Sequence, residues 1–216
     1  MDIGDKLDDL RREYSGLPLE ESAAPKNPYV LFEDWFDAAV KSKVPDPHAM
    51  VLATADRSGK PSARVVLMRG FDENGFVFYT NYGSRKGREI SSNPFGAVVF
   101  FWREVDRQVR AEGEIMRVTA SESDRYFDSR PRESRIAAWA SSQSSTLGSR
   151  KVLDDLFVKF SDEFRNRPLV RPPNWGGFRL SAERIEFWQG RPNRLHDRLL
   201  YSRDKSGSWT VARLAP

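Results

Sequence analysis

The feature that most constrains the fold is a succession of short, largely apolar runs separated by turn sequences between residues 49 and 118. Asp56-Arg57-Ser58-Gly59 and Asp72-Glu73-Asn74-Gly75 are typical turns of this kind. Strands are expected over residues 50–55, 63–70, 76–80, 95–103 and 108–118. Many short antiparallel strands with helices at the ends and in one insertion predict an α+β protein built on a β-barrel.

Helical signals flank these strands. Asn27 followed by Pro28 matches an N-cap with proline at the first helical position, and residues 119–122 form a capping box. Helices are expected over residues 5–14, 28–42, 85–92, 120–129, 133–140 and 150–165, and further strands over 177–180, 184–188, 194–202 and 209–213. Residues 15–28 are expected to form a linker. The prediction is a flexible N-terminal segment, residues 1–25, and a single domain, residues 26–216.

Composition excludes several classes of protein. The 35 basic and 31 acidic residues are interleaved, giving a net charge of +4 without the basic stripe of a nucleic-acid binder. Cysteine is absent and there are only two histidines, so disulfides, thiolate nucleophiles and a metal site are not expected. The N-terminus is unlike a signal peptide, and the longest apolar run, residues 97–102, is too short to span a membrane. A cytoplasmic protein with no membrane or nucleic-acid partner is expected.

The tail carries the most informative polar cluster. If residues 194–202 form a strand, Arg194, His196 and Arg198 share one face, while Asp197 faces the other way. Two guanidiniums beside an imidazole make an anion site, and their charge should keep His196 neutral at pH 7. The alternative is a solvated basic edge strand.

Other clusters point to anionic ligands as well. Residues 81–87 form a glycine-containing turn into a helix, where Arg85 and Lys86 make a phosphate site or merely a solvated basic turn. Arg64 and Arg69 fall on one predicted strand, on opposite faces.

Tyr126 and Arg130 are four residues apart on one predicted helix face. Ser134 follows near the start of the next helix, where it either joins this site or simply caps the helix. Residues 141–145 form a polar loop that either binds a ligand or is a plain connection.

These clusters and several further motifs, taken in order, resemble the pyridoxine/pyridoxamine 5′-phosphate oxidase family over nearly the whole chain. The motifs are Arg11-Arg12-Glu13-Tyr14, Phe78-Tyr79-Thr80-Asn81, Ser84-Arg85-Lys86, Arg107-Gln108-Val109, Ser129-Arg130-Pro131-Arg132, Gln143-Ser144, Trp175-Gly176-Gly177-Phe178-Arg179, Glu186-Phe187-Trp188-Gln189-Gly190 and the Arg213-Leu214-Ala215-Pro216 terminus. The resemblance implies an FMN-binding split β-barrel that works as a homodimer with FMN at the subunit interface.

The resemblance also implies the site residues. FMN would be held by Arg64, Tyr79, Thr80, Arg85, Lys86, Gln108, Gln143, Ser144, Trp188 and Arg198. The substrate phosphate would meet Arg69, Tyr126, Arg130 and Ser134, and the catalytic pair Arg194 and His196 would lie over the pyridine ring. Arg11 and Tyr14 match a segment that can close over the substrate. The family usually has lysine at the position of Arg69. The planar guanidinium group of arginine does not bind a phosphate in the same geometry as the compact ammonium group of lysine.

The implied reaction oxidises pyridoxine 5′-phosphate or pyridoxamine 5′-phosphate to pyridoxal 5′-phosphate, with O₂ as acceptor and H₂O₂ as product. On this resemblance the flavin N5 would take a hydride equivalent from the substrate C4′, and His196 would either accept a proton or only position the substrate. Three alternatives stay open: a phenazine-type flavin oxidase of the same fold, a non-catalytic flavin- or haem-binding barrel, and a barrel that binds single-stranded nucleic acid.

Overall fold

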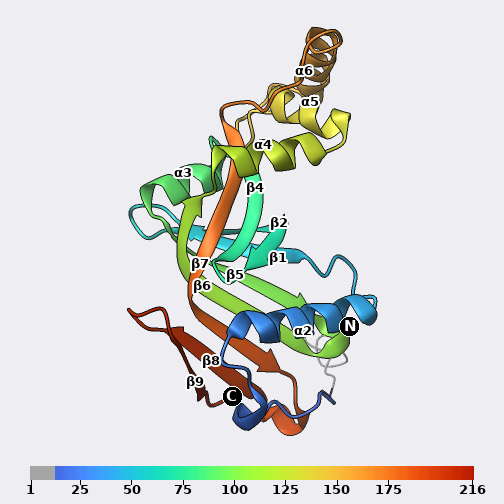
Figure 1. Ribbon diagram of the computed structural model, residues 1–216. Helices are drawn as coiled ribbons and strands as arrows, with labels where there is room; N and C mark the ends of the chain where they lie inside the picture. Colours follow the sequence, from blue (N-terminus) through green and yellow to red (C-terminus); the bar gives the residue numbers. More distant parts are fainter. Residues whose placement is uncertain (1–12) are drawn as a thin grey trace, which may run out of the picture. The chain divides into compact units, whose positions relative to one another are not determined.

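The computed structural model describes residues 13–216 (Figure 1). Arg11 and most of the helix predicted over residues 5–14 lie outside the described residues. The described strands are hydrogen-bonded in the order β2-β1-β5-β6-β7-β4-β3, with β8 pairing with β7 and β9 with β8. The chain forms two compact units, and β5 (Phe95–Trp102), β6 (Arg107–Arg117) and β7 (Trp175–Gln189) each contribute residues to both.

The first unit contains residues 13–47, 99–111 and 183–216. Its helix α2 (Pro28–Lys41) begins as predicted, because the Asn27 side chain accepts a hydrogen bond from the first-turn backbone and proline occupies the first position. Phe32 and Trp35 of α2 are buried against aromatic side chains, with ring centroids 5.1 Å from Phe100 and 5.3 Å from Phe187 respectively. The hairpin of β8 (Asp197–Arg203) and β9 (Trp209–Arg213) extends β7 in this unit.

The second unit contains residues 48–98 and 112–182. Antiparallel pairing joins β1 (Ala49–Ala55) to β2 (Pro61–Leu67), β3 (Gly70–Asp72) to β4 (Gly75–Asn81), and β4 to β7. The helices of this unit are α3 (Arg85–Ser92), α4 (Ala120–Ser129), α5 (Arg132–Ala140) and α6 (Arg150–Glu163). The predicted capping box of α4 is present, with Thr119 and Glu122 bonding each other's backbone.

The prediction of a strand over residues 63–70 is wrong at its end. β2 stops at Leu67, and residues 70–72 form the separate short strand β3. Arg69 therefore lies between two strands rather than on one strand with Arg64, and the alternation that would place the two arginines on opposite faces does not apply to it.

The two strands predicted over residues 177–180 and 184–188 are one continuous strand, β7. The backbone of β6 lies close to this strand at the expected break, since a Cβ at Gly113 would lie 2.0 Å from the carbonyl oxygen of Ser181. The missing side chain lets β6 approach the residue at which the break was expected.

The strand predicted from residue 194 begins only at Asp197. Residues Pro192–Arg194 form a 3₁₀ turn in which Asn193 and Arg194 have φ angles of 57° and 60°. A left-handed backbone cannot continue a β-ladder, so Arg194 does not share a strand face with His196 and Arg198. Within residues 13–216, no helix is both long and apolar enough to cross a membrane.

Candidate active site

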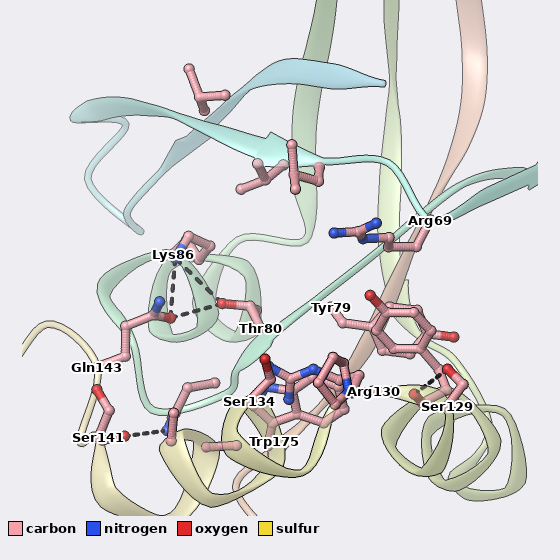
Figure 2. A pocket seen from close by; sticks show the side chains of 18 residues that line it. Arg69, Tyr79, Thr80, Lys86, Ser129, Arg130, Ser134, Ser141, Gln143 and Trp175 are labelled. Atoms are coloured by element: carbon pink, nitrogen blue, oxygen red, sulfur yellow. Dashed lines mark hydrogen bonds between the residues drawn. The ribbon is translucent and has the colours of Figure 1, made fainter. Parts of the chain in front are cut away.

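A cavity of about 620 Å³ opens in the second unit (Figure 2). Its walls come from β2, β4, α3, α4, α5, the loop after α5 and the start of β7. Eight residues predicted to bind flavin or substrate line it together: Arg69, Tyr79, Thr80, Lys86, Tyr126, Arg130, Ser134 and Gln143. The structure therefore brings residues from four of the predicted polar clusters together in one cavity.

One end of the cavity presents a buried ammonium group at a helix N-terminus. Lys86 Nζ lies 3.3 Å from both Thr80 Oγ1 and Gln143 Oε1, and Thr80 donates a hydrogen bond of 2.9 Å to Gln143 (Figure 2). Burial and the positive charge of Arg64 lower the pKa of Lys86. Ser84 caps α3 by accepting a hydrogen bond from the Gly87 amide. Cation, amide and helix N-terminus together favour an anionic group here.

The α3 turn requires a glycine. A Cβ at Gly87 would lie 2.2 Å from the carbonyl oxygen of Tyr82, a distance that side chains do not tolerate. The sequence 81–87 was predicted to be a glycine-containing turn into a helix, and the structure confirms this and supplies the reason for the glycine.

Stacked aromatic rings line the other end of the cavity, and the guanidinium of Arg130 lies against one of them. Tyr79 and Tyr126 stack with ring centroids 3.9 Å apart, and Trp175 lies 5.6 Å from the Tyr79 ring. The Arg130 guanidinium lies 4.7 Å from the Trp175 ring centroid. Its Nη1 is buried and has no hydrogen-bond partner among the described residues. Burial lowers the pKa of Arg130, and the charge of Arg69 lowers it further, whereas Tyr126 raises it.

An arginine donor that is buried without an acceptor is costly, so this position is suited to a ligand anion. Ser134 lines the same end of the cavity. It is not the cap of α5, because Pro131 occupies that position. The interpretation of Ser134 as a simple helix cap is therefore wrong.

A second group of predicted residues lies in the first unit. The rings of Tyr14, Trp188 and His196 are in mutual contact, with centroids 4.6 Å apart for Trp188 and His196 and 5.1 Å apart for Tyr14 and His196. The Arg191 amide donates a hydrogen bond of 3.1 Å to His196 Nδ1. Burial, and then the charge of Arg194, lower the pKa of His196. This is the predicted direction, but burial is the larger cause and only one of the two flanking arginines contributes.

Arg198, also in the first unit, is held by a buried carboxylate. Its Nε donates to Glu186 at 2.8 Å, and its Nη1 donates to the Ala215 carbonyl oxygen at 2.7 Å. Gln108 is half-buried on β6, and Arg194 is exposed on the 3₁₀ turn.

The remaining predicted residues of the second unit are not lining residues of the cavity. Arg64 and Arg85 both bind Glu89, and Ser144 is exposed in the loop after α5 with a φ of 70°. Glu89, Trp175 and Glu186 belong to these sites but were not predicted as site residues. Glu89 follows Arg85 by four residues on a helix, and this spacing predicts an ion pair between the two side chains. Trp175 lies in a motif that supports the family resemblance, but its residue type and spacing alone do not distinguish it from a core aromatic residue.

The class of protein follows from the fold. A solved FMN-binding protein from Nostoc punctiforme, described as related to pyridoxamine 5′-phosphate oxidase, superposes with a TM-score of 0.69 at 17% identity, covering 93% of this chain and 100% of that chain. The predicted α+β split β-barrel of flavin-binding proteins is thereby confirmed as the fold.

The chain belongs to the pyridoxine/pyridoxamine 5′-phosphate oxidase family, a family of oxidase enzymes. Residues 36–161 match the family described as pyridoxamine 5′-phosphate oxidase, and residues 175–216 match its C-terminal dimerisation region. Proteins named pyridoxine/pyridoxamine 5′-phosphate oxidase are 54% identical over 212 residues in Burkholderia thailandensis and 50% identical over 208 residues in Nostoc punctiforme, covering 97% and 96% of this chain and 99% and 97% of those proteins.

A solved structure of PhzG from Burkholderia lata, in complex with tetrahydrophenazine-1-carboxylic acid, is also similar. It has a TM-score of 0.88 and 32% identity, and it covers 95% of this chain and 100% of that one. The chain is thus similar both to proteins named pyridoxine/pyridoxamine 5′-phosphate oxidase and to a protein solved with a different aromatic ligand. The substrate of this chain is therefore argued from the side chains of the cavity.

Proposed function

We propose that this protein oxidises pyridoxine 5′-phosphate and pyridoxamine 5′-phosphate to pyridoxal 5′-phosphate, using FMN and O₂ and releasing H₂O₂. The observation that carries the proposal is the buried, unpartnered Nη1 of Arg130 at the aromatic end of the cavity. A phosphate ester supplies the acceptor that this donor lacks.

The neighbouring side chains support a phosphate at this end. Arg69 adds a second cation and Tyr126 a hydroxyl group, and the charges of both act on Arg130. Ser134 adds another hydroxyl group beside Arg130 (Figure 2). A hydrogen bond to a charged group contributes about 1.5–3 kcal/mol net, and a micromolar ligand needs about 8 kcal/mol. Several such hydrogen bonds, together with contact against the Trp175 ring, would supply about the free energy that micromolar binding requires.

The opposite end fits the phosphate of FMN. Lys86, the α3 N-terminus and the Thr80–Gln143 pair offer a cation and polar groups within one wall of the cavity. Arg64, Tyr79, Arg85, Gln108, Ser144, Trp188 and Arg198 are the further proposed FMN ligands. When bound, the flavin supplies the hydride acceptor that no side chain of this chain can replace.

The proposed enzyme is a homodimer with FMN at the subunit interface. The match of residues 175–216 to a dimerisation region supports this assembly. The proposed FMN ligands fall in both units of the chain, with Trp188 and Arg198 inside the dimerisation region itself.

Arg194 and His196 are proposed to position the pyridine ring and to stabilise charge at the reacting carbon. The contacts of Tyr14 with Trp188 and His196 support a covering role for the N-terminal segment. Exclusion of water by such a cover would strengthen every polar contact beneath it.

A spectroscopic and kinetic assay tests the proposal. The purified protein should be yellow and release FMN, and pyridoxine 5′-phosphate in air should give peroxide and an aldehyde. Unphosphorylated pyridoxine should react far more weakly. A colourless protein that FMN does not restore would refute the flavin assignment.

The likeness to PhzG supports a second candidate substrate, a partly reduced tricyclic aromatic acid. The same assay with such an acid separates the two candidates, because a carboxylate attached directly to a ring lacks the phosphomethyl arm and offers two acceptor oxygens where a phosphate ester offers three. Faster turnover of the acid than of pyridoxine 5′-phosphate would favour the second candidate.

A further inference from the structure

Glu89 is a buried carboxylate at the centre of a cluster of donors in the second unit. It lies on α3 and is only 6% exposed. Its Oε2 accepts hydrogen bonds from Thr54 Oγ1 at 2.5 Å and from Ser62 Oγ at 2.6 Å. Burial disfavours the charged form, but the hydrogen bonds outweigh it and lower the pKa of Glu89 to about 2. The carboxylate is therefore ionised at neutral pH.

The first arginine at Glu89 is Arg64, which is fixed on several sides. Its Nη2 lies 3.3 Å from Glu89 Oε2 and also donates to Ser62 Oγ. Its Nη1 donates to the Leu52 carbonyl oxygen at 3.1 Å and to Thr54 Oγ1 at 2.6 Å. Strands β1 and β2 and helix α3 together hold this guanidinium in one orientation.

The second arginine at Glu89 is Arg85, which is held at one atom only. Its Nε donates to Glu89 Oε1 at 2.8 Å, and its side chain is 56% exposed. Its two terminal Nη groups make no hydrogen bond among the described residues. A guanidinium anchored through Nε keeps its plane fixed while its outer donors remain available for an anion.

The charge of Glu89 also reaches Lys86. Burial and Arg64 lower the pKa of Lys86, and Glu89 opposes them. Three cations and one carboxylate leave two net positive charges, which matches a phosphate monoester with roughly −1.5 to −2 charge at pH 7. Arg64, Arg85 and Glu89 therefore act together with Lys86 on the charge at this end of the cavity.

We propose that Glu89 is a positioning residue for the flavin phosphate, because its carboxylate orients the guanidiniums of Arg64 and Arg85 for that anion. The proposal deepens the proposed function and rests on it. Glu89 does not itself contact the phosphate, since two anions repel, and it acts only through the arginines.

The test uses the full chain freed of flavin, titrated with FMN and with riboflavin, which lacks the phosphate. In Glu89→Gln the amide offers one acceptor oxygen in place of two and turns an NH₂ group toward other donors. One guanidinium therefore loses its anchor. The FMN Kd should rise about 10- to 100-fold, as for loss of a charge-assisted contact, while the riboflavin Kd stays within about twofold.

Three further variants separate positioning from mere structural support. Glu163→Gln is the control for loss of an i,i+4 ion pair, since Glu163, the last residue of α6, lies 2.8 Å from Arg167 beyond the helix end, and it should leave both affinities unchanged. Arg85→Ala combined with Glu89→Gln should weaken FMN binding less than the two single effects multiplied, because the two residues act through one contact. Ser62→Ala removes one donor without removing charge and should raise the FMN Kd about threefold, with a normal circular dichroism spectrum.

Several outcomes would overturn the proposal. Equal losses of FMN and riboflavin affinity would mean that Glu89 only supports the fold. Tighter FMN binding by Glu89→Gln would mean that the carboxylate merely offsets positive charge. A wild-type chain that binds riboflavin but gains nothing from the phosphate would refute the positioning role, whereas a chain that binds neither flavin would refute the proposed function as well.

Discussion

The hydrogen bond at His196 predicts how this residue acts in the proposed reaction. Nδ1 accepts the Arg191 amide at 3.1 Å, so a neutral ring must carry its proton on Nε2. The lowered pKa of His196, due to burial and then to Arg194, keeps the ring neutral at pH 7. In the proposed reaction Nε2 would therefore donate a hydrogen bond to the substrate and could not accept its proton.

Two substitutions of His196 distinguish a hydrogen-bond donor from a general base. Glutamine places an NH₂ group near the position of Nε2, whereas asparagine can keep only the acceptor for Arg191. For a donor to developing negative charge, worth about 1.5–3 kcal/mol, His196→Asn should lower kcat about 10- to 150-fold. His196→Gln should lie within about tenfold of wild type. A general base contributes about 10²- to 10⁴-fold, and neither amide would replace it.

Peroxide formation from pyridoxine 5′-phosphate between pH 5.5 and 9 measures both variants. The tautomer itself can be read from ¹⁵N NMR shifts of the imidazole, which is practical because the chain has only two histidines. His48→Gln assigns the other signal. A proton on Nδ1 at neutral pH, or equal losses above about 100-fold in both variants, would refute the donor role.

Other contacts give equally direct expectations. Arg130→Met should raise KM for the phosphorylated substrate about 10- to 150-fold and leave the weak reaction of pyridoxine unchanged, as steady-state assays would show. Gly87→Ala places a Cβ 2.2 Å from the Tyr82 carbonyl oxygen, so unfolding in urea should show a loss of about 1–3 kcal/mol. The pKa of Glu89 is about 2 against an ordinary 4.5, so its contribution to stability is present above pH 4.5 and is lost as pH falls toward 2. Urea midpoints of Glu89→Gln should therefore fall less steeply than those of wild type over that range.

The elements that could be predicted from the sequence are those with signals in neighbouring residues. Asn27 and Pro28 begin α2, and the pair Thr119 and Glu122 begins α4, because each cap is completed within one turn. The three-residue strand β3 has no such signal, being too short to show alternation. The start of β8 was misplaced because the left-handed residues Asn193 and Arg194 interrupt a run whose side chains alternate plausibly.

The residues of the candidate site also divide into those that neighbouring sequence predicts and those that depend on distant segments. Tyr126 and Arg130 could be placed together from helical spacing alone, and both line the cavity. The buried Nη1 of Arg130 depends on Trp175, which follows some forty-five residues later and reads in the sequence as an ordinary core residue. A local pattern identifies which side chains carry charge, whereas packing between distant segments decides which of those charges lack a partner.

In each unit a buried carboxylate holds the Nε of an arginine that we propose as an FMN ligand. In the second unit Glu89 accepts from Arg85 Nε, and in the first Glu186, only 4% exposed, accepts from Arg198 Nε at 2.8 Å.

Each carboxylate also binds another arginine, since Glu89 contacts Arg64, and Arg110 Nη2 lies 2.8 Å from Glu186. A free arginine side chain loses about 2 kcal/mol of rotamer entropy when a ligand immobilises it. An arginine already held through Nε has lost most of that freedom on folding, so less is lost on binding. If these arginines bind FMN as proposed, both buried carboxylates orient them before the ligand arrives, and their effect should appear in flavin affinity rather than in the rate of the chemical step.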